Sequence, residues 1–422
     1  GPEEGPPTSG PNPIAELEEG VYKRADGSYE IPNVTTVAGA NVWTVDDDKA
    51  QCPNAEFTHI QEAVEYANPW DTIVVCPGTY EESSTPVNST ANPVETGATN
   101  GLTIKQPLKI IGAGADKVTI KPASSVSTLA VTPAKLRDGG GNVITVSRQS
   151  LGSTEYDEEY VDISGVTIES GSTTAEAGVA FFNSSGRIAD SVVKGGGWGV
   201  VETNSMQSAG EGTPERQVTI EGSTIKGYSA GGVLFDGSKG GADGAATNPE
   251  RSGMDQVGYI TDSTVEGSGG GSAVPQTGVA YRSGARGVIT GSAILGNHGT
   301  TGTSYGILAA EAGPLSVKST TIAGNGGSGY GLYNGNATVT GLSTGDAIDA
   351  IGDHWGTSGI PVRGESVLGS TDQQGYAGPA EVMPVAGSAL SAPTTPSLMP
   401  DQAPVGEIVN PGDGETAEVG VA

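Results

Sequence analysis

Aromatic and charged residues are scarce in this sequence. Aromatic residues make up 5% of the 422 positions and charged residues 16%, whereas glycine occurs 68 times and proline 26 times. Because glycine and proline both weaken helices, this composition excludes a fold built mainly of long amphipathic helices. No run approaches the ~20 apolar residues that a transmembrane helix needs. We therefore expect strands and turns, and no membrane insertion.

Cations are few as well. Lysine and arginine together number 20 against 49 acidic residues, which gives a formal net charge of −29. A surface that neutralises phosphates needs clustered cations. This balance excludes nucleic acid and anionic membrane surfaces as expected partners.

Only two cysteines occur, Cys52 and Cys76, and neither has a histidine or a further cysteine beside it. A zinc site is therefore not expected. The pair favours a disulfide, and with it an oxidising compartment, so we expect a secreted or cell-surface protein. The alternative is a pair of buried free thiols.

Both ends of the chain are rich in proline, glycine, serine, threonine and acids, with little apolar periodicity. We expect residues 1–40 and 385–422 to be tails or linkers. Residues 41–384 then form the folded domain.

An internal repeat dominates that domain. Six segments share a phrase in which Ile or Val stands at the first and sixth positions, and 11 to 18 positions after its first residue comes a Gly followed by a short apolar run. Two strands per repeat are therefore expected. The six phrases are Ile163–Ile168, Ile188–Val193, Ile220–Ile225, Ile260–Val265, Ile289–Ile294 and Val317–Ile322.

The repeat length varies. Successive phrases start 25, 32, 40, 29 and 28 residues apart, which solenoids of fixed repeat length do not tolerate. A coil of short parallel strands with loops of any length at its corners does. For both apolar ends of a phrase to point inward, the chain has to bend between them, for example at Asp262-Ser263. A β-sandwich is the alternative, but sandwiches do not reuse one phrase in this way.

A short helix is predicted ahead of the repeats. The stretch Thr58–Gln61 has the form of a capping box, and Ile60, Ala63, Val64 and Ala67 fall on one helical face. A helix laid over the end of the coil would cover an otherwise unpaired strand edge.

Three stretches carry a family resemblance: FTHIQEAVEYANPWDTIVVCPGTYEE at 57–82, LKIIGAGADKVTI at 108–120, and DAIGDHWG at 349–356. They resemble the N-terminal turns and the closing phrase of the pectin-lyase-like superfamily, although Asp353 and His354 depart from the closing phrase. The resemblance spans roughly residues 42–360. It implies an all-β fold, a single-stranded right-handed parallel β-helix with a short N-terminal capping helix. It does not imply one activity, because this fold hosts lyases, hydrolases, esterases and adhesins.

Catalytic motifs are weak. The Gly-His-Gly of polygalacturonase-like hydrolases and the phrase typical of pectin methylesterases are both missing. Arg282 and Arg286 flank Tyr281 in the densest basic and aromatic stretch, which suits holding a uronate carboxylate and acid or base catalysis of β-elimination. His298, in a glycine-rich insertion, is a third catalytic candidate. The alternative places all three in corners and solvent loops.

Aromatic residues recur near the second strand of the repeats, where a ladder of rings would stack against sugars. Inward packing is the alternative. The carbohydrate-binding candidates are Trp198, Tyr281, Tyr305, Tyr330 and Tyr333.

Acidic residues recur near the repeat corners at Asp190, Glu221 and Asp262. Stacked carboxylates would suit calcium, whereas the alternative makes them turn residues. No cofactor motif is present, so calcium is the one ion that we consider.

These observations predict a carbohydrate-facing protein, a polysaccharide-binding or adhesive module whose partner is a polysaccharide or cell-surface glycan. One alternative is an enzyme, an acidic-polysaccharide lyase or a glycoside hydrolase. Another is a structural spacer or filament subunit.

Overall fold

The computed structural model describes residues 22–23, 29–30, 41–84, 101–123, 141–147, 160–171, 176–182, 184–203, 216–237, 256–336, 347–365 and 373–390. Most of the two predicted tails lies outside these residues. The chain divides into two compact units, unit 1 up to Val192 and unit 2 from Val193 to Thr394. Each is described by itself.

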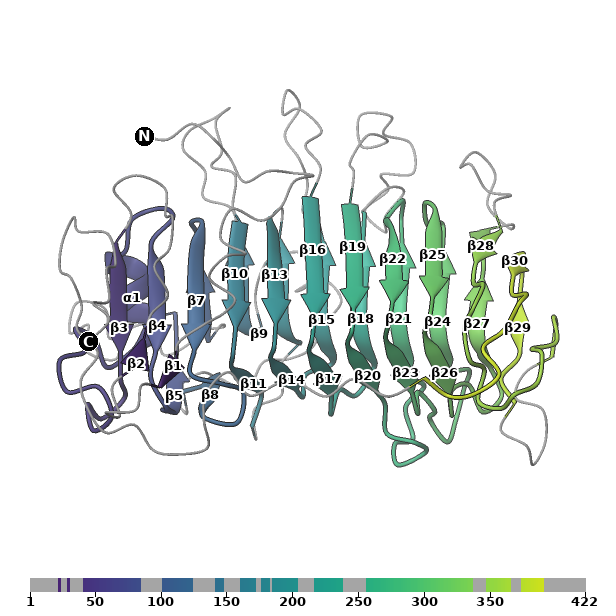
Figure 1. The fold of residues 1–422 in the computed structure, drawn as a ribbon, viewed down its shortest axis with the longest axis horizontal. Coiled ribbons are helices and arrows are strands. Elements are labelled where there is room, and N and C mark those ends of the chain that lie inside the picture. The colour runs from purple at the N-terminus through teal and green to yellow at the C-terminus, as the bar shows by residue number, and fades with distance from the viewer. Residues whose placement is uncertain are drawn as a thin grey trace, which may run out of the picture. The chain divides into compact units, whose positions relative to one another are not determined.

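Unit 1 is a coil of three parallel sheets, which the chain visits in turn (Figure 1). The first sheet contains β3 (Val42–Val45), β4 (Thr72–Val75), β7 (Leu108–Gly112), β10 (Tyr160–Ser164) and β13 (Ser185–Ala189). The second contains β5 (Gly78–Glu82), β8 (Val118–Pro122) and β11 (Thr167–Glu169). The third contains β6 (Leu102–Ile104), β9 (Asn142–Ser147) and β12 (Ala177–Phe182). A separate antiparallel pair, β1 (Tyr22–Lys23) and β2 (Tyr29–Glu30), lies within the segment predicted as a tail.

Unit 2 repeats this plan. Its first sheet contains β16 (Arg216–Glu221), β19 (Gln256–Thr261), β22 (Arg286–Thr290), β25 (Leu315–Lys318), β28 (Ile348–Asp349) and β30 (Ala380–Glu381). Its second contains β17 (Thr224–Lys226), β20 (Thr264–Glu266), β23 (Ala293–Leu295) and β26 (Thr321–Ala323), and β14 (Val192–Lys194) begins at the boundary between the units. Its third contains β15 (Trp198–Thr203), β18 (Gly231–Asp236), β21 (Thr277–Arg282), β24 (Tyr305–Ala310), β27 (Tyr330–Asn334) and β29 (Tyr376–Ala377). The predicted right-handed parallel β-helix is confirmed. Among the described residues, no helix has the length and apolarity needed to cross a membrane.

The apolar ends of the repeat phrases form inward ladders. In unit 2, Ile260 pairs in register with Ile220 on one side and Ile289 on the other, and Val265 pairs with Ile225 and Ile294. All twelve predicted ladder residues have an exposed fraction of 0%. The predicted phasing of the repeats is therefore confirmed within each unit.

We expect Ile260→Ala to lower the free energy of unfolding by about 2–5 kcal/mol, because it leaves a cavity between two stacked neighbours. Thr261→Ala changes a partly exposed side chain on the other strand face and should cost far less. Equilibrium denaturant unfolding measures both. Equal losses in the two variants would contradict the inward ladder.

A hydroxyl ladder fixes the bend between the first and second sheets. Asp262 adopts the left-handed conformation, with φ of 47°, and the Ser263 hydroxyl donates to the carbonyl of Thr261 at 2.8 Å. The same hydroxyl accepts from the backbone N–H of Ser223 at 3.1 Å, while the N–H of Ser263 donates to the Ser292 hydroxyl. Each turn thus satisfies a donor of the turn before it, and the bend predicted at Asp262-Ser263 is confirmed.

Helix α1 (Ile60–Tyr66) packs against β3, β4 and β6 through its buried face. The predicted capping box is wrong: the N-cap residue is His59, and it makes no side-chain cap hydrogen bond. The carboxylate of Glu82 in β5 accepts instead from the backbone N–H groups of Ile60 at 2.6 Å and Gln61 at 3.1 Å. A side chain from β5, the second strand after the helix, therefore satisfies two of the unpaired donors at the start of the helix.

Burial raises the pKa of Glu82 to about 7, against the opposing effect of the two backbone hydrogen bonds. The folded state then holds this proton more tightly than the unfolded chain. The resulting stabilisation is complete below the unfolded pKa of 4.5 and is lost as the pH rises through about 7.

Relative to Glu82→Gln, which keeps an acceptor but does not ionise, the parent should lose roughly 3 kcal/mol of stability between pH 4 and pH 8. Thermal unfolding of both proteins across this range measures the difference. Parallel pH profiles would show that Glu82 does not titrate as described.

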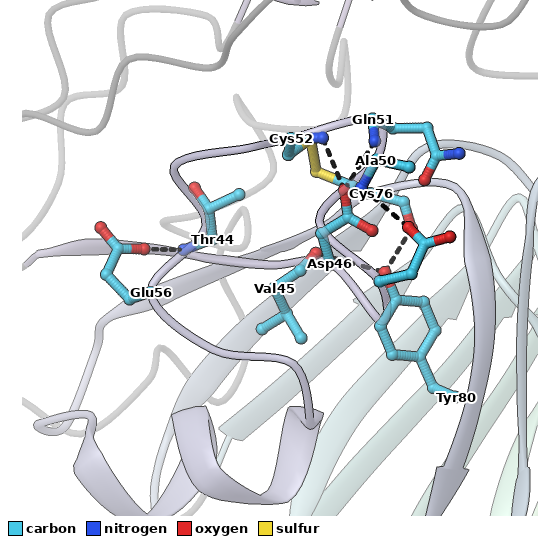
Figure 2. The surroundings of a disulfide bond; sticks show 10 residues. Thr44, Val45, Asp46, Ala50, Gln51, Cys52, Glu56, Cys76 and Tyr80 are labelled. Atoms are coloured by element: carbon cyan, nitrogen blue, oxygen red, sulfur yellow. Dashed lines mark hydrogen bonds between the residues drawn. A yellow bond between two sulfur atoms is a disulfide. The ribbon is translucent and has the colours of Figure 1, made fainter.

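The predicted disulfide between Cys52 and Cys76 is present and ties the segment after β3 to the end of β4 (Figure 2). Both half-cystines are buried. Asp46 accepts from the backbone N–H of Cys52 at 2.5 Å and from that of Gln51 at 3.0 Å. The Tyr80 hydroxyl donates to the carbonyl of Cys76 at 2.6 Å. The bond thus lies inside a hydrogen-bonded N-terminal turn.

Reduction should lower the midpoint of unfolding, because cross-links of this loop length remove about 3 kcal/mol of unfolded-state freedom in the chain-entropy model. Calorimetry with and without reductant measures the shift, and a Cys52→Ser, Cys76→Ser double variant that is insensitive to reductant is the control. Two free thiols in non-reducing mass spectrometry would contradict the prediction.

Candidate carbohydrate-binding surface

The third sheet of unit 2 aligns several of the aromatic candidates. Register partners run from Trp198 to Gly231, then Thr277, Tyr305 and Tyr330. Because parallel strands lie about 4.8 Å apart, Trp198 and Tyr305 are about 14 Å apart along this row. Trp198, Tyr305 and Tyr330 are all partly exposed.

Three tyrosines form a cluster on the outer face of β24 and β27, which we call the tyrosine platform: Tyr305, Tyr330 and Tyr333. The ring centroids of Tyr305 and Tyr333 are 5.2 Å apart, and those of Tyr330 and Tyr333 are 6.0 Å apart. Each ring is partly exposed. Partial burial, followed by the two neighbouring phenols, raises the pKa of Tyr305. The platform therefore presents neutral rings whose faces can pack on the C–H face of a sugar.

Trp198 extends over the next turn. A Cβ atom added at Gly231 would collide with the Trp198 ring. Glycine at 231 is therefore needed to seat this ring against β18, which fixes its position on the surface.

Tyr281 corrects the aromatic prediction. Its side chain has an exposed fraction of 0%, its ring centroid is 4.9 Å from that of Phe235, and its hydroxyl donates to the carbonyl of Gly258 at 2.7 Å. Since side chains alternate along a strand, Tyr281 points into the coil and Arg282 points out. Tyr281 is a core residue and is not available to a sugar.

The three catalytic candidates come from three different elements. Arg282 ends β21 on the outer face of the third sheet, whereas Arg286 begins β22 in the first sheet. His298 lies in the loop before β24, where its ring is beside Gly270 and Gly327 and its carbonyl accepts from the Gly270 N–H at 2.9 Å. A catalytic role for any of the three residues stays a prediction.

Sequence reasoning missed Asp236, the register partner of Arg282 on the outer face. Both side chains are partly exposed. A signal for this pair exists in the sequence, because each residue stands four positions after the first residue of a Gly-Val dipeptide, Gly232-Val233 or Gly278-Val279.

The acidic ladder is not formed as predicted. Glu221 pairs in register with Thr261, while Asp262 occupies the following corner position, where Gly222 stands in the earlier turn. Asp190 is also a corner residue, with φ of 48°. Glu221 is the second residue of its repeat phrase, whereas Asp190 and Asp262 are the third residues of theirs. Glu221 therefore lies one position before the corner that Asp262 occupies. Calcium binding itself stays a prediction.

Within the described residues, Asp46, Asp47 and Asp48 bring carboxylate oxygens within 4.8 Å of one another. Asp46 already accepts from Gln51 and Cys52, and Asp47 accepts from the Thr79 N–H at 3.1 Å. These carboxylates hold the disulfide turn and the start of β5 in place.

No model of a known protein family matches the chain, and no curated protein matches it in sequence. Among solved structures, it is similar to the pectin methylesterase PemA from Erwinia chrysanthemi, at 12% identity and a TM-score of 0.33, over 68% of this chain and 79% of that one. It is also similar to an alginate lyase from Paenibacillus sp. str. FPU-7, at 15% identity and a TM-score of 0.36, over 77% of this chain and 93% of that one. The fold rests on the strand pairing described above.

Proposed function

We propose that the protein is a polysaccharide-binding module whose ligand lies on the outer face of the third sheet of unit 2. The tyrosine platform is the observation that carries this proposal. A contiguous group of large rings that stay partly exposed on a rigid sheet is typical of a binding surface. Tyrosine suits sugars because its ring is apolar and its hydroxyl can hydrogen-bond.

The row that contains Trp198 supports an extended ligand. Its aromatic members stand at two places about 14 Å apart along one direction, and a chain of sugars could contact both places at once. Contacts at two places raise affinity through effective concentration. The proposal therefore favours a polymer over a single sugar.

The charge balance favours a glycan with few negative charges. The net charge of −29 repels polyanions, and the platform itself contains no cation. The buried disulfide supports a secreted or cell-surface location, where such bonds persist and where polysaccharides are met.

The pair Asp236 and Arg282 favours a second candidate function, a glycan-active enzyme. A carboxylate and a guanidinium side by side on an exposed sheet can supply a base and a partner for a sugar carboxylate. Reducing-end and unsaturated-product assays on a panel of polysaccharides separate this from binding. Turnover by the parent that is lost in Asp236→Asn would favour the enzyme, and binding without turnover would favour the module.

We expect Tyr333→Ala to weaken binding of a neutral polysaccharide found on a glycan array by roughly three- to tenfold, because the platform loses the ring that contacts both others. Tyr66→Ala removes a tyrosine that is 58% exposed on α1 and should leave binding unchanged. Isothermal titration calorimetry on both variants checks this. Unchanged binding in Tyr333→Ala, or equal loss in Tyr66→Ala, would contradict the platform.

A further inference from the structure

A cleft of about 450 Å³ lies on the first sheet of unit 2, apart from the tyrosine platform. Its floor is one row of register partners on the outer face: Tyr259 in β19, Val288 in β22, Ser316 in β25 and Asp349 in β28. All four side chains are partly exposed. Because neighbouring parallel strands lie about 4.8 Å apart, the row is about 14 Å long. The volume falls in the range that small-molecule sites occupy, and the row is long enough for a short run of linked sugars.

One end of this floor is apolar. Tyr259 contributes its ring, and Val288 lies beside it in the next strand. Leu315 and Ile348, which are buried, and Pro314, which is exposed, complete the apolar lining. A partly exposed ring next to apolar side chains is a surface on which the C–H face of a sugar can pack.

The other end of the floor is polar. The Asp349 carboxylate is held in place, since its Oδ2 lies 2.7 Å from the Lys318 ammonium and its Oδ1 accepts from the backbone N–H of Ile351 at 3.4 Å. An ionised carboxylate has about four lone-pair sites, so this one can accept further hydrogen bonds. The Ser316 hydroxyl, which comes before Asp349 in the row, can both donate and accept. These groups suit neighbouring hydroxyls on a sugar ring.

The charges that line the cleft are already partnered. Asp349 pairs with Lys318, and Arg286, which also lines the cleft, has an interaction partner of its own. Among the described lining residues, an anionic ligand would therefore meet no unpaired cation, and the net charge of −29 would repel it. A cationic ligand would have to compete with Lys318 for Asp349. A neutral ligand with many hydroxyls avoids both costs.

We propose that this cleft is a second sugar-binding site for a neutral polysaccharide. That the ligand is a polysaccharide rests on the proposed function, whereas the place and the neutral charge rest on the Tyr259 row and the pair of Lys318 and Asp349. The cleft lies on the first sheet and the tyrosine platform on the third, so the two sites belong to different faces of the coil. Unit 2 then binds glycan at two places, and one molecule can link two polymer chains.

The test is calorimetric titration of the full-length protein with the neutral tetrasaccharide that binds most tightly on the glycan array. We expect the parent to bind about two tetrasaccharides per molecule and Tyr259→Ala to bind about one, because alanine leaves no ring for the sugar to pack on. Tyr66→Ala, which removes an exposed ring on α1 away from the cleft, is the control and should keep the parent stoichiometry.

A second arm tests the charge argument in the Tyr333→Ala background, where the platform is weakened and the cleft dominates binding. We expect the neutral tetrasaccharide to bind at least about tenfold tighter than tetragalacturonate at low salt, where repulsion is least screened. Adding Asp349→Asn removes the carboxylate that compensates Lys318 and leaves a cation beside the cleft. Most of the preference for the neutral ligand should then be lost.

A stoichiometry that is the same in Tyr259→Ala as in the parent would overturn the proposal. Equal binding of the two tetrasaccharides in the Tyr333→Ala background would overturn its neutral-ligand part. If Tyr259→Ala does not fold, Ser316→Trp, which fills the cleft from its floor, should remove the same site. If the platform alone fails, the parent binds one tetrasaccharide and Tyr259→Ala abolishes that binding. If the cleft alone fails, the parent again binds one, but Tyr333→Ala weakens it and Tyr259→Ala does not.

Discussion

The in-register parallel pairing of successive turns is the constraint on which the rest of the structure depends. Ile220, Ile260 and Ile289 share one environment because their backbones pair directly. A slip of one residue would turn each apolar side chain outward and each outer side chain inward. The same register that stacks the core therefore also stacks the surface. Rows such as Trp198, Thr277 and Tyr305 exist because the inward ladders align their strands.

Hydrogen bonds at the corner turns maintain this register. Where no Ser or Thr hydroxyl is available to accept from a backbone N–H, a carboxyl group accepts instead. Along the corner ladder, the N–H of each turn finds a Ser or Thr hydroxyl in the next turn, until the N–H of Thr320 meets the carboxyl of Asp353 at 2.9 Å. In unit 1, the carboxylate of Glu82 likewise accepts from the first backbone N–H groups of α1. Burial raises the pKa of Asp353 to about 8, as it raises that of Glu82 to about 7. Satisfying donors at these places thus brings a buried acid that resists ionisation at neutral pH.

Sequence reasoning succeeded where the signal repeats and failed where it depends on the neighbouring strand. The apolar phrase recurs in six turns, so its inward phase and the bend within it could be predicted. The cap of α1 could not, because Glu82 is 22 positions from Ile60 and nothing local connects them. Tyr281 was predicted on the wrong face of its strand. Its side chain points inward, and that of the next residue, Arg282, points outward. Asp236 could have been found by aligning the Gly-Val dipeptides.

Proximity in sequence was equally misleading at Arg282 and Arg286. Only four positions separate them, but the corner at Ser283 and Gly284, both with positive φ, sends them to different sheets. Arg286 instead lines a cleft on the first sheet together with Tyr259 and Asn336. These two residues come from other turns and share no sequence pattern with Arg286. In a coil of this kind, neighbours on the surface are separated by a whole turn of variable length. Residues that share a place on the surface can therefore be recognised only once the register of the turns is known, because their spacing in the sequence does not bring them together.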